Sequence, residues 1–362
     1  MTAKIQRREG LKSWMAAQAA TRSSTSPHTI SRIQAFASAP GPNTSSYTLL
    51  QVDTRSGVTG YGECRSLSRA DVQALDQLVG RPAYAYEALT PLAPLPARGG
   101  LNMALLDIVG KTTNAPVYRV LGGPTRFKAR AIARLAGTTD SELQQDLQRQ
   151  SGLGIRAFLI PVDKPPAPNQ GSHFVKTHVQ RMKALKIAAP QADFAFEATD
   201  QLSSGDASSL AAALEPMRPL WFDEPCPVTN LETIRKIADE TVVPLGFGRT
   251  IAEPSTFQDL LREGLIDLVR PDLQIYGISG VCRIASMAET YYTAVAPWHE
   301  AGPISTAAAL HAAASMPNFF ILQIPKAGVG SSVIREGFFE LPKGPGLGVH
   351  VDIKDWERNR IA

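Results

Sequence analysis

The feature that most constrains the fold of this chain is a regular alternation of short apolar runs and helical stretches after residue 125. The apolar runs cover 129–135, 155–162, 193–198, 219–225, 242–248, 265–272, 292–299 and 319–325. Between them lie stretches such as "SLAAALEPM" and "LETIRKIADE", whose apolar spacing is typical of helices. Strands that alternate with helices predict a parallel β/α barrel over 126–325, and a doubly wound sheet is the alternative.

Two further regions flank this repeat. Residues 28–125 begin with short alternating strands separated by Gly, Pro and Asn turns, and helices are expected over 70–80 and 100–123. This pattern predicts a small α+β domain. Residues 326–362 are rich in turns, and we expect them to pack back on that domain.

Residues 1–27 are interpreted as a disordered leader. The alternative is a twin-arginine export signal, because Arg7 and Arg8 are followed by Leu11, Lys12 and a run of small residues. The first interpretation predicts a cytoplasmic protein, and the second predicts a periplasmic one.

The composition argues against several kinds of partner. The net charge is +4, from 37 basic and 33 acidic residues spread without runs, so the chain lacks the basic stripe of nucleic-acid-binding proteins. No apolar run reaches the roughly 18 residues of a membrane helix. The three cysteines, Cys64, Cys226 and Cys282, match no metal-binding spacing. We therefore expect neither a nucleic-acid partner nor a membrane.

Ionisable side chains stand at the C-terminal ends of the predicted strands, where the active sites of β/α barrels lie. The successive ends carry Pro161, Glu197, Asp223, Arg249, Asp272, His299 and Gln323. Glu197, Asp223 and Arg249 follow one another at intervals of 26 residues, which is one strand–helix repeat. We expect these side chains to point into one cavity.

Several stretches of the chain, taken together, resemble a known family. The stretches that carry the resemblance are "TGYGE", "ALLDIVGKTTNAPVYRVLGG", "LWFDEP", "PLGFGRT", "LIDLVRPDL", "APWHEAGPIS" and "LPKGPGLGV". Together they resemble the enolase superfamily, in its mandelate racemase and acid-sugar dehydratase branch, from about residue 28 to 352. The resemblance implies a modified TIM barrel, (β/α)7β, with an N-terminal α+β capping domain that the C-terminal tail completes.

The resemblance also implies a chemistry. In this family three carboxylates at strand ends bind Mg²⁺, which holds the substrate carboxylate and stabilises the enediolate formed when the α-proton is removed. A Lys-x-Lys pair on the second barrel strand or a His–Asp dyad supplies the base. An acid on the eighth strand commonly hydrogen-bonds the developing oxyanion. The family also implies a homo-oligomer.

The metal-ligand positions depart from this pattern. Glu197 stands where the family usually has Asp, Asp223 where it usually has Glu, and Arg249 where a third acid is expected. A guanidinium can neutralise two carboxylates with its planar set of donors. We therefore expect Arg249 to fill a degenerate metal site and Mg²⁺ to be lost. The alternative is that Arg249 swings away and that Glu224, Asp200 or water completes the ligand shell.

Of the remaining site positions, some match the family pattern and others depart from it. Leu159 and Pro161 occupy the Lys-x-Lys positions, so no base is expected there. The resemblance assigns His299 and Asp272 as an acid/base dyad. It also assigns Arg249, Gln323 and Glu63 to substrate binding, with Gln323 in place of the usual acid on the last strand. For Glu63 the alternative is a carboxylate that stabilises a turn.

These residues support three functional hypotheses. The first is a lyase or isomerase that abstracts the α-proton of a small carboxylate such as an acid sugar. The second is a non-catalytic homologue that binds a small anion through Arg249. The third combines the two: an elimination without a metal, in which Arg249 holds the substrate carboxylate.

Overall fold

The computed structural model describes residues 26–38, 46–165, 167–169, 171–326 and 328–361. The predicted leader therefore lies almost entirely outside the described residues. No helix within the described ranges is both long enough and apolar enough to cross a membrane.

The first part of the chain forms a three-stranded antiparallel sheet packed against a central helix. The strands are β1 (Ile30–Ala37), β2 (Tyr47–Thr54) and β3 (Thr59–Arg65), and the helices are α2 (Arg69–Ala74), α3 (Tyr86–Leu89), α4 (Arg98–Thr112) and α5 (Val117–Val120). Helix α4 lies directly on β3, because Gly60 and Gly62 leave room for its backbone. A Cβ at Gly62 would lie 1.9 Å from the carbonyl oxygen of Gly100.

The helix expected over 100–123 is broken in the structure. Helix α4 ends at Thr112, and α5 begins only at Val117. Asn114 adopts a left-handed conformation with φ of 51°, and Pro116 cannot donate the hydrogen bond that a continuous helix would need. The apolar periodicity of this stretch therefore extends across a turn that the prediction missed.

The second part is an α/β fold with a mostly parallel sheet. Its strands are β4 (Lys128–Arg134), β5 (Ala157–Pro161), β6 (Asp193–Glu197), β7 (Phe222–Asp223), β8 (Leu245–Phe247), β9 (Leu268–Val269), β10 (Ala294–Val295) and β11 (Leu322–Ile324). The strands from β4 to β10 pair in chain order, and β11 pairs in parallel with β4. An isolated parallel bridge between Val295 and Phe319 connects β10 with the residues that lead into β11.

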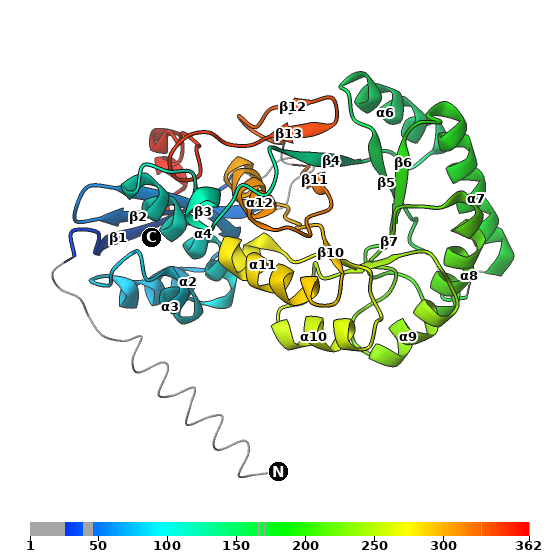
Figure 1. The fold of residues 1–362 in the computed structure, drawn as a ribbon, viewed down its shortest axis with the longest axis horizontal. Helices are drawn as coiled ribbons and strands as arrows, with labels where there is room; N and C mark the ends of the chain where they lie inside the picture. The colour runs from blue at the N-terminus through cyan, green and yellow to red at the C-terminus, as the bar shows by residue number, and fades with distance from the viewer. Residues whose placement is uncertain (1–25, 39–45, 166, 170, 327, 362) are drawn as a thin grey trace, which may run out of the picture.

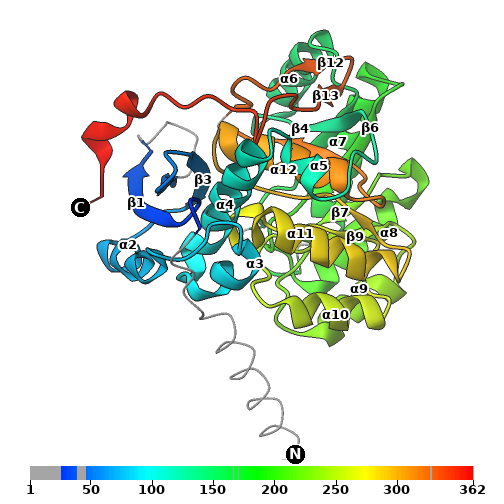
Figure 2. The ribbon, with the colours of Figure 1, turned by 60° about the vertical axis from the view of Figure 1, so that its left-hand side comes forward.

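Helices connect these strands and cover one side of the sheet. They are α6 (Asp140–Gly152), α7 (Gly171–Ala188), α8 (Ser204–Leu214), α9 (Leu231–Asp239), α10 (Pro254–Arg262), α11 (Leu273–Glu289) and α12 (Pro303–Ser315). Figure 1 shows α6 to α10 along the outer rim, whereas α11 and α12 lie toward the first sheet. The turned view in Figure 2 also places α4 beside α11.

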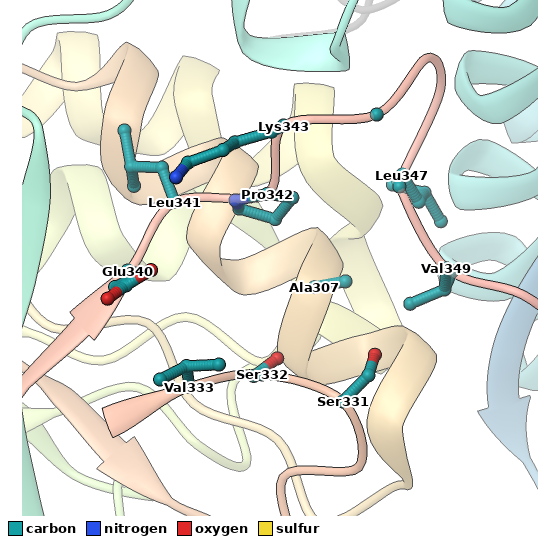
Figure 3. Close-up of a pocket in the computed structure, with 12 residues that line it drawn as sticks. Ala307, Ser331, Ser332, Val333, Glu340, Leu341, Pro342, Lys343, Leu347 and Val349 are labelled. Atoms are coloured by element: carbon teal, nitrogen blue, oxygen red, sulfur yellow. The ribbon is translucent and has the colours of Figure 1, made fainter. Parts of the chain in front are cut away.

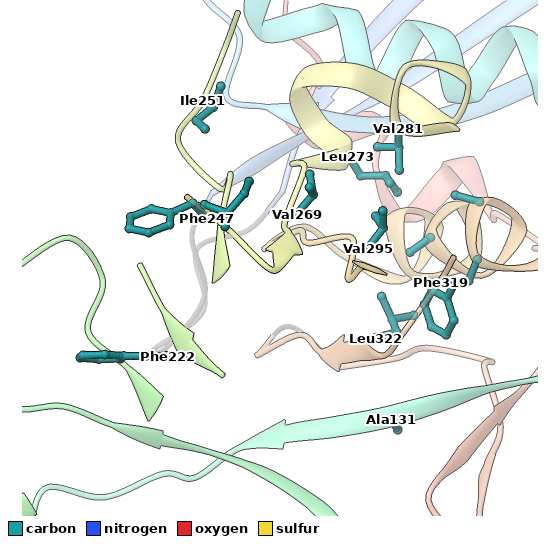
Figure 4. Packing of buried hydrophobic residues seen from close by; sticks show 14 of the residues in the cluster. Ala131, Phe222, Phe247, Ile251, Val269, Leu273, Val281, Val295, Phe319 and Leu322 are labelled. Atoms are coloured by element: carbon teal, nitrogen blue, oxygen red, sulfur yellow. The ribbon is translucent and has the colours of Figure 1, made fainter. Parts of the chain in front are cut away.

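Alternate residues of the strands enter two different cores. On β5, Phe158 and Ile160 join the large cluster between strands and helices, while Ala157 and Leu159 join a smaller cluster. Figure 4 shows part of the large cluster, to which strands and helices contribute. The smaller cluster takes its members from or beside most of the parallel strands: Ile132, Ala157, Leu159, Ala195, Trp221, Leu268, Ala296 and Ile321. The sheet therefore curves around an apolar interior.

The C-terminal segment divides between the two parts. Strands β12 (Ile334–Arg335) and β13 (Phe338–Glu340) form a hairpin, and β13 pairs antiparallel with β4 of the large sheet. Farther along, the Leu347 amide donates to Asp107 of α4 at 2.8 Å, and the Ile361 amide donates to Ala35 of β1 at 2.9 Å. The later residues of this segment thus contact the first sheet and its helix. The domain boundaries drawn from the sequence remain predictions.

The buried histidine of α12 should make the fold acid-sensitive. The Tyr118 amide donates to His311 Nδ1 at 3.2 Å, and burial lowers the pKa of His311 from 6.5 to about 4. The unfolded chain therefore takes up a proton below about pH 6.5 that the folded chain refuses until about pH 4, so the free energy of unfolding falls as the pH drops. Between pH 7 and pH 5 this histidine should account for a loss of about 2 kcal/mol.

His311→Asn removes the titrating group and retains an acceptor near the position of Nδ1. We expect the difference in unfolding free energy between pH 7 and pH 5, measured by urea titration, to become smaller in this variant. An unchanged difference would show that His311 is not the source of acid sensitivity.

Candidate functional site

Two carboxylates stand side by side at the ends of neighbouring strands. Glu197 ends β6 and Asp223 ends β7, and the two residues are direct partners in the parallel register. Their exposed fractions are 3% and 0%. Buried carboxylates this close to each other require nearby cations if both are to be ionised.

Arg249 reaches both carboxylates from the next strand. Its Nη1 atom lies 2.6 Å from Glu197 Oε1 and 3.7 Å from Asp223 Oδ2. Gly248 directs the chain toward this position with a φ of 144°, and a Cβ there would lie 2.7 Å from the Phe257 ring. The structure thus brings together the three residues that the sequence spaced one repeat apart.

Glu224 fixes the backbone of the arginine. Its Oε1 atom accepts hydrogen bonds from the amides of Gly248 at 2.7 Å and Arg249 at 2.8 Å. Burial, together with the charges of Asp223 and Asp200, raises the pKa of Glu224 to about 8. Glu224 therefore holds the turn at Arg249 in place. The structure does not show the alternative arrangement, in which Arg249 moves away and Glu224 completes a metal site.

The charges of Glu197 and Arg249 stabilise each other, whereas burial outweighs the partners of Asp223 and raises the pKa of that carboxyl. Burial opposes ionisation of Glu197, but Arg249 and then Arg134 outweigh it and lower the pKa of this carboxyl below its ordinary value. Burial likewise opposes the charge of Arg249, and the two carboxylates, Asp223 first, raise its pKa overall. Glu197 also pairs with Arg134 Nε from β4, so a second guanidinium reaches it from the other side.

Arg270 is a site residue that the sequence reasoning missed. It is fully buried just after β9, with Nε 2.9 Å from Asp223 Oδ1 and Nη2 donating to Gln323 Oε1 at 2.7 Å. Gln323, expected to bind substrate, is therefore a partner of this arginine. The signal was present, because Arg270 lies two residues before Asp272 and period-two alternation places both on the same face of the strand.

Asp272 and His299 do not form the expected dyad. Asp272 Oδ1 accepts from the Gln274 amide at the start of α11, and Oδ2 pairs with Arg65 of β3 at 2.8 Å. Within the described ranges, His299 makes no hydrogen bond to another side chain. Asp272 is held elsewhere because an Asp before a helix caps its N-terminus and Arg65 takes the remaining oxygen.

His299 is nevertheless a buried residue at a strand end. Its exposed fraction is 4%, and it follows Trp298, which bridges in parallel to Asp272. Burial lowers the pKa of His299 to about 4, whereas the Ala301 backbone acts in the opposite direction. The imidazole is therefore neutral near pH 7 and, in this buried state, a weaker base than an ordinary histidine.

Glu63, expected either to touch the substrate or to stabilise a turn, is fully buried. Its carboxylate accepts from the amides of Ile304 at 3.3 Å and Ser305 at 2.9 Å, in the first turn of α12. Burial raises the pKa of Glu63 to about 7. Its position therefore supports a role in joining β3 to α12, since a carboxylate near a helix N-terminus satisfies free amides.

A cleft opens beside these strand ends. It has a volume of about 290 Å³ and is lined by Ser46, Tyr47, Arg65, Asp272, Gln274, Trp298 and Glu300. The ring of Trp298 also stacks under the guanidinium of Arg249, whose central carbon lies 5.1 Å from the ring centroid. Trp298 thus connects the cleft with the cluster of arginines and carboxylates.

A second cleft, of about 340 Å³, lies between α12 and the C-terminal segment. Figure 3 shows Ala307, Ser331, Ser332 and Lys343 among its lining residues. It contains none of the site residues predicted from the sequence, so it does not compete with the strand-end site.

The Arg249–Glu197 pair should be a substantial source of stability. Arg249→Met leaves Glu197 with Arg134 alone, and breaking a buried ion pair typically costs about 3 kcal/mol or more. We expect urea unfolding at neutral pH to show a loss of that order. Glu197→Gln combined with Arg249→Met should recover part of the loss because the buried carboxylate that lost one of its two arginines is no longer charged. Equal unfolding free energies for wild type and Arg249→Met would contradict this account.

Comparisons with known proteins agree with this architecture. Residues 19–122 match the family model for the mandelate racemase / muconate lactonizing enzyme N-terminal domain, and residues 142–356 match the enolase C-terminal domain-like family. A curated relative, a D-galactonate dehydratase of Variovorax paradoxus, is 28% identical over 357 residues, covering 89% of this chain and 92% of the relative.

Solved structures give the same result. A mandelate racemase/muconate lactonizing enzyme-like protein from Rubrobacter xylanophilus is 26% identical with a TM-score of 0.83, covering 92% of this chain and 98% of that one. A similarly described protein from Roseovarius sp. TM1035 is 25% identical with a TM-score of 0.83, covering 91% and 95%. On these matches, the chain belongs to the enolase superfamily, in its mandelate racemase / muconate lactonizing enzyme group.

Proposed function

We propose that this protein is a lyase of the acid-sugar dehydratase type that acts on a small hydroxy acid. Family membership and the similarity to a D-galactonate dehydratase support a dehydratase-type enzyme. The observation that carries the proposal is a buried arginine held by two carboxylates at the strand ends. Arg249 stacks on Trp298, and the next residue of the chain is the buried His299.

The proposed reaction removes water across the bond between Cα and Cβ of the substrate. His299, neutral near pH 7, takes the α-proton, and the electron pair left on Cα delocalises into the substrate carboxylate as an enediolate. The pair then forms the Cα–Cβ double bond while the Cβ hydroxyl leaves, and the imidazolium returns its proton to that hydroxyl to release water. When the substrate is a 2,3-dihydroxy acid, the product keeps the hydroxyl of Cα as an enol, which tautomerises to a 2-keto acid.

Arg249 supplies the positive charge that this sequence requires. Its guanidinium would pair with the substrate carboxylate and stabilise the enediolate through preorganised hydrogen-bond donors. A bound carboxylate near His299 would also raise the low pKa of the imidazole and make it a stronger base. Asp272 is given no part in this step because Arg65 and the α11 amide hold it.

The residues do not fit the family's Mg²⁺ at this position. Mg²⁺ needs an octahedron of oxygen ligands, but the guanidinium of Arg249 lies against Glu197 and Asp223 is held by Arg270. The described part of the chain offers no group of three or more His, Cys, Asp or Glu side chains arranged to hold a metal ion. In the proposed reaction the positive charge therefore comes from Arg249.

We also propose that the parallel sheet closes into a barrel. The parallel pairing of β11 with β4 and the Val295–Phe319 bridge support closure of the sheet into the family's (β/α)7β ring. Closure would bring the ends of β6 to β11 around one opening, as the chemistry requires. The homo-oligomer implied by the family stays a prediction.

A non-catalytic anion-binding protein is the second candidate. It is favoured by Leu159 and Pro161, both buried on β5 where the family's paired lysines would stand. The two candidates differ in a single step, because only the enzyme converts the acid after Arg249 has bound it.

Turnover in the presence of EDTA tests the proposed function. D-galactonate and a panel of other aldonic acids are incubated with the protein, and 2-keto acid is measured as its semicarbazone. We expect turnover that EDTA does not abolish. His299→Asn should lower kcat by about 10²- to 10⁴-fold, because it removes the general base.

His311→Asn provides the matched control, since it replaces a buried histidine away from the strand ends. It should keep full activity at pH 7. Full activity of His299→Asn would remove this residue from the reaction, and loss of turnover with EDTA would return a metal to it. Binding of aldonic acids through Arg249 without any conversion would favour the second candidate.

A further inference from the structure

Arg270 occupies a position from which it acts on two other strands at once. It is fully buried, pairs with Asp223 at the end of β7 and donates to Gln323 on β11. Its guanidinium carbon also lies 5.5 Å from the centroid of the Trp221 ring. The side chain therefore extends across the interior side of the sheet as a fixed cation.

The sequence of β8 leaves room for this arrangement. A Cβ at Gly246 would lie 2.7 Å from a ring carbon of Trp221 and 3.2 Å from Asp223 Oδ1. Any larger residue would push the indole or the carboxylate away from Arg270. Glycine at this position thus belongs to the geometry that pairs Asp223 with Arg270.

Each buried carboxylate consequently has an arginine that the other does not share. Glu197 pairs with Arg134 as well as Arg249, and Asp223 pairs with Arg270 at a shorter distance than with Arg249, 2.9 Å against 3.7 Å. Three guanidinium groups thus face two carboxylates. Removing the charge of Arg249 alone leaves each carboxylate with one arginine partner.

The arginines differ in their freedom to move. The side chain of Arg134 is 28% exposed and can turn toward solvent, whereas that of Arg270 is 0% exposed and is fixed at both ends. A cation that approached Asp223 would meet the guanidinium of Arg270, which cannot move away from it. The repulsion is strong in a buried site, where charges are poorly screened.

We infer that Arg270 is a second and independent positioning residue that closes this site to divalent cations by holding Asp223. Replacing Arg249 with an acid restores the family's third carboxylate but does not restore cation binding while Arg270 remains. The inference concerns cation binding to the folded protein and does not depend on any turnover.

The test compares melting temperatures with and without MgCl₂ in four proteins: wild type, Arg249→Glu, Arg249→Glu/Arg270→Gln and Arg249→Glu/Arg270→Lys. A cation that binds only the folded state raises the melting temperature. We expect a saturable rise of about 2 °C or more only in the Arg270→Gln double variant. The Arg270→Lys double variant is the matched control, because it keeps the positive charge. NaCl at equal ionic strength corrects for screening.

Two results would overturn the inference. One is a Mg²⁺-specific rise in Arg249→Glu alone that equals the rise in the double variant, since Arg270 would then exclude nothing. The other is the absence of a rise in a cooperatively folded Arg270→Gln double variant. If that variant does not fold, Arg249→Glu alone still decides, because a Mg²⁺-specific rise there contradicts the inference. Failure of the wild type to convert any aldonic acid would count against the proposed function and would leave this result unchanged.

Discussion

The pairing of buried carboxylates with buried arginines is the constraint on which the site depends. Glu197 and Asp223 are neighbours in the sheet and almost without solvent contact. Two such charges are tolerated only where cations and hydrogen bonds offset the cost of their desolvation. The surrounding residues serve this arrangement: Gly246 leaves room for Asp223, Gly248 directs Arg249, and Glu224 holds the backbone of Arg249.

The kind of cation has chemical consequences. A metal ion exchanges ligands and can take a substrate carboxylate directly into its coordination shell, whereas a guanidinium offers a fixed planar set of donors. Arg249 and Arg270 each carry a single charge, and only Arg249 has any exposed surface, 8% against 0%. A substrate would therefore meet Arg249, while Arg270 acts through Asp223 and Gln323. Such a site is better suited to holding an anion in one orientation than to polarising it as strongly as a metal ion would.

Much of the fold could be predicted because strands leave a local pattern. Each of the eight apolar runs overlaps one of the parallel strands, and the intervals of 26 residues correctly placed Arg249 beside Glu197. The errors arose where contacts between residues far apart in the sequence determine which side chains pair. Asp272 was expected to pair with His299, but Arg65 from a distant strand and the first turn of α11 take its oxygens. Glu63 had two interpretations, as a substrate contact or a turn-stabilising carboxylate, and the folded chain places it against α12.

The sequence by itself determined which side chains end the strands, because alternation along a strand and the length of one strand–helix repeat are local properties of the chain. Only the tertiary structure decided which of these side chains pair. Arg270 reaches Asp223 and Gln323, and Arg65 reaches Asp272, across separations of 47, 53 and 207 residues. The strength of a charge pair depends on distance and burial, and neither exists until the sheet has curved and the first domain has packed against it.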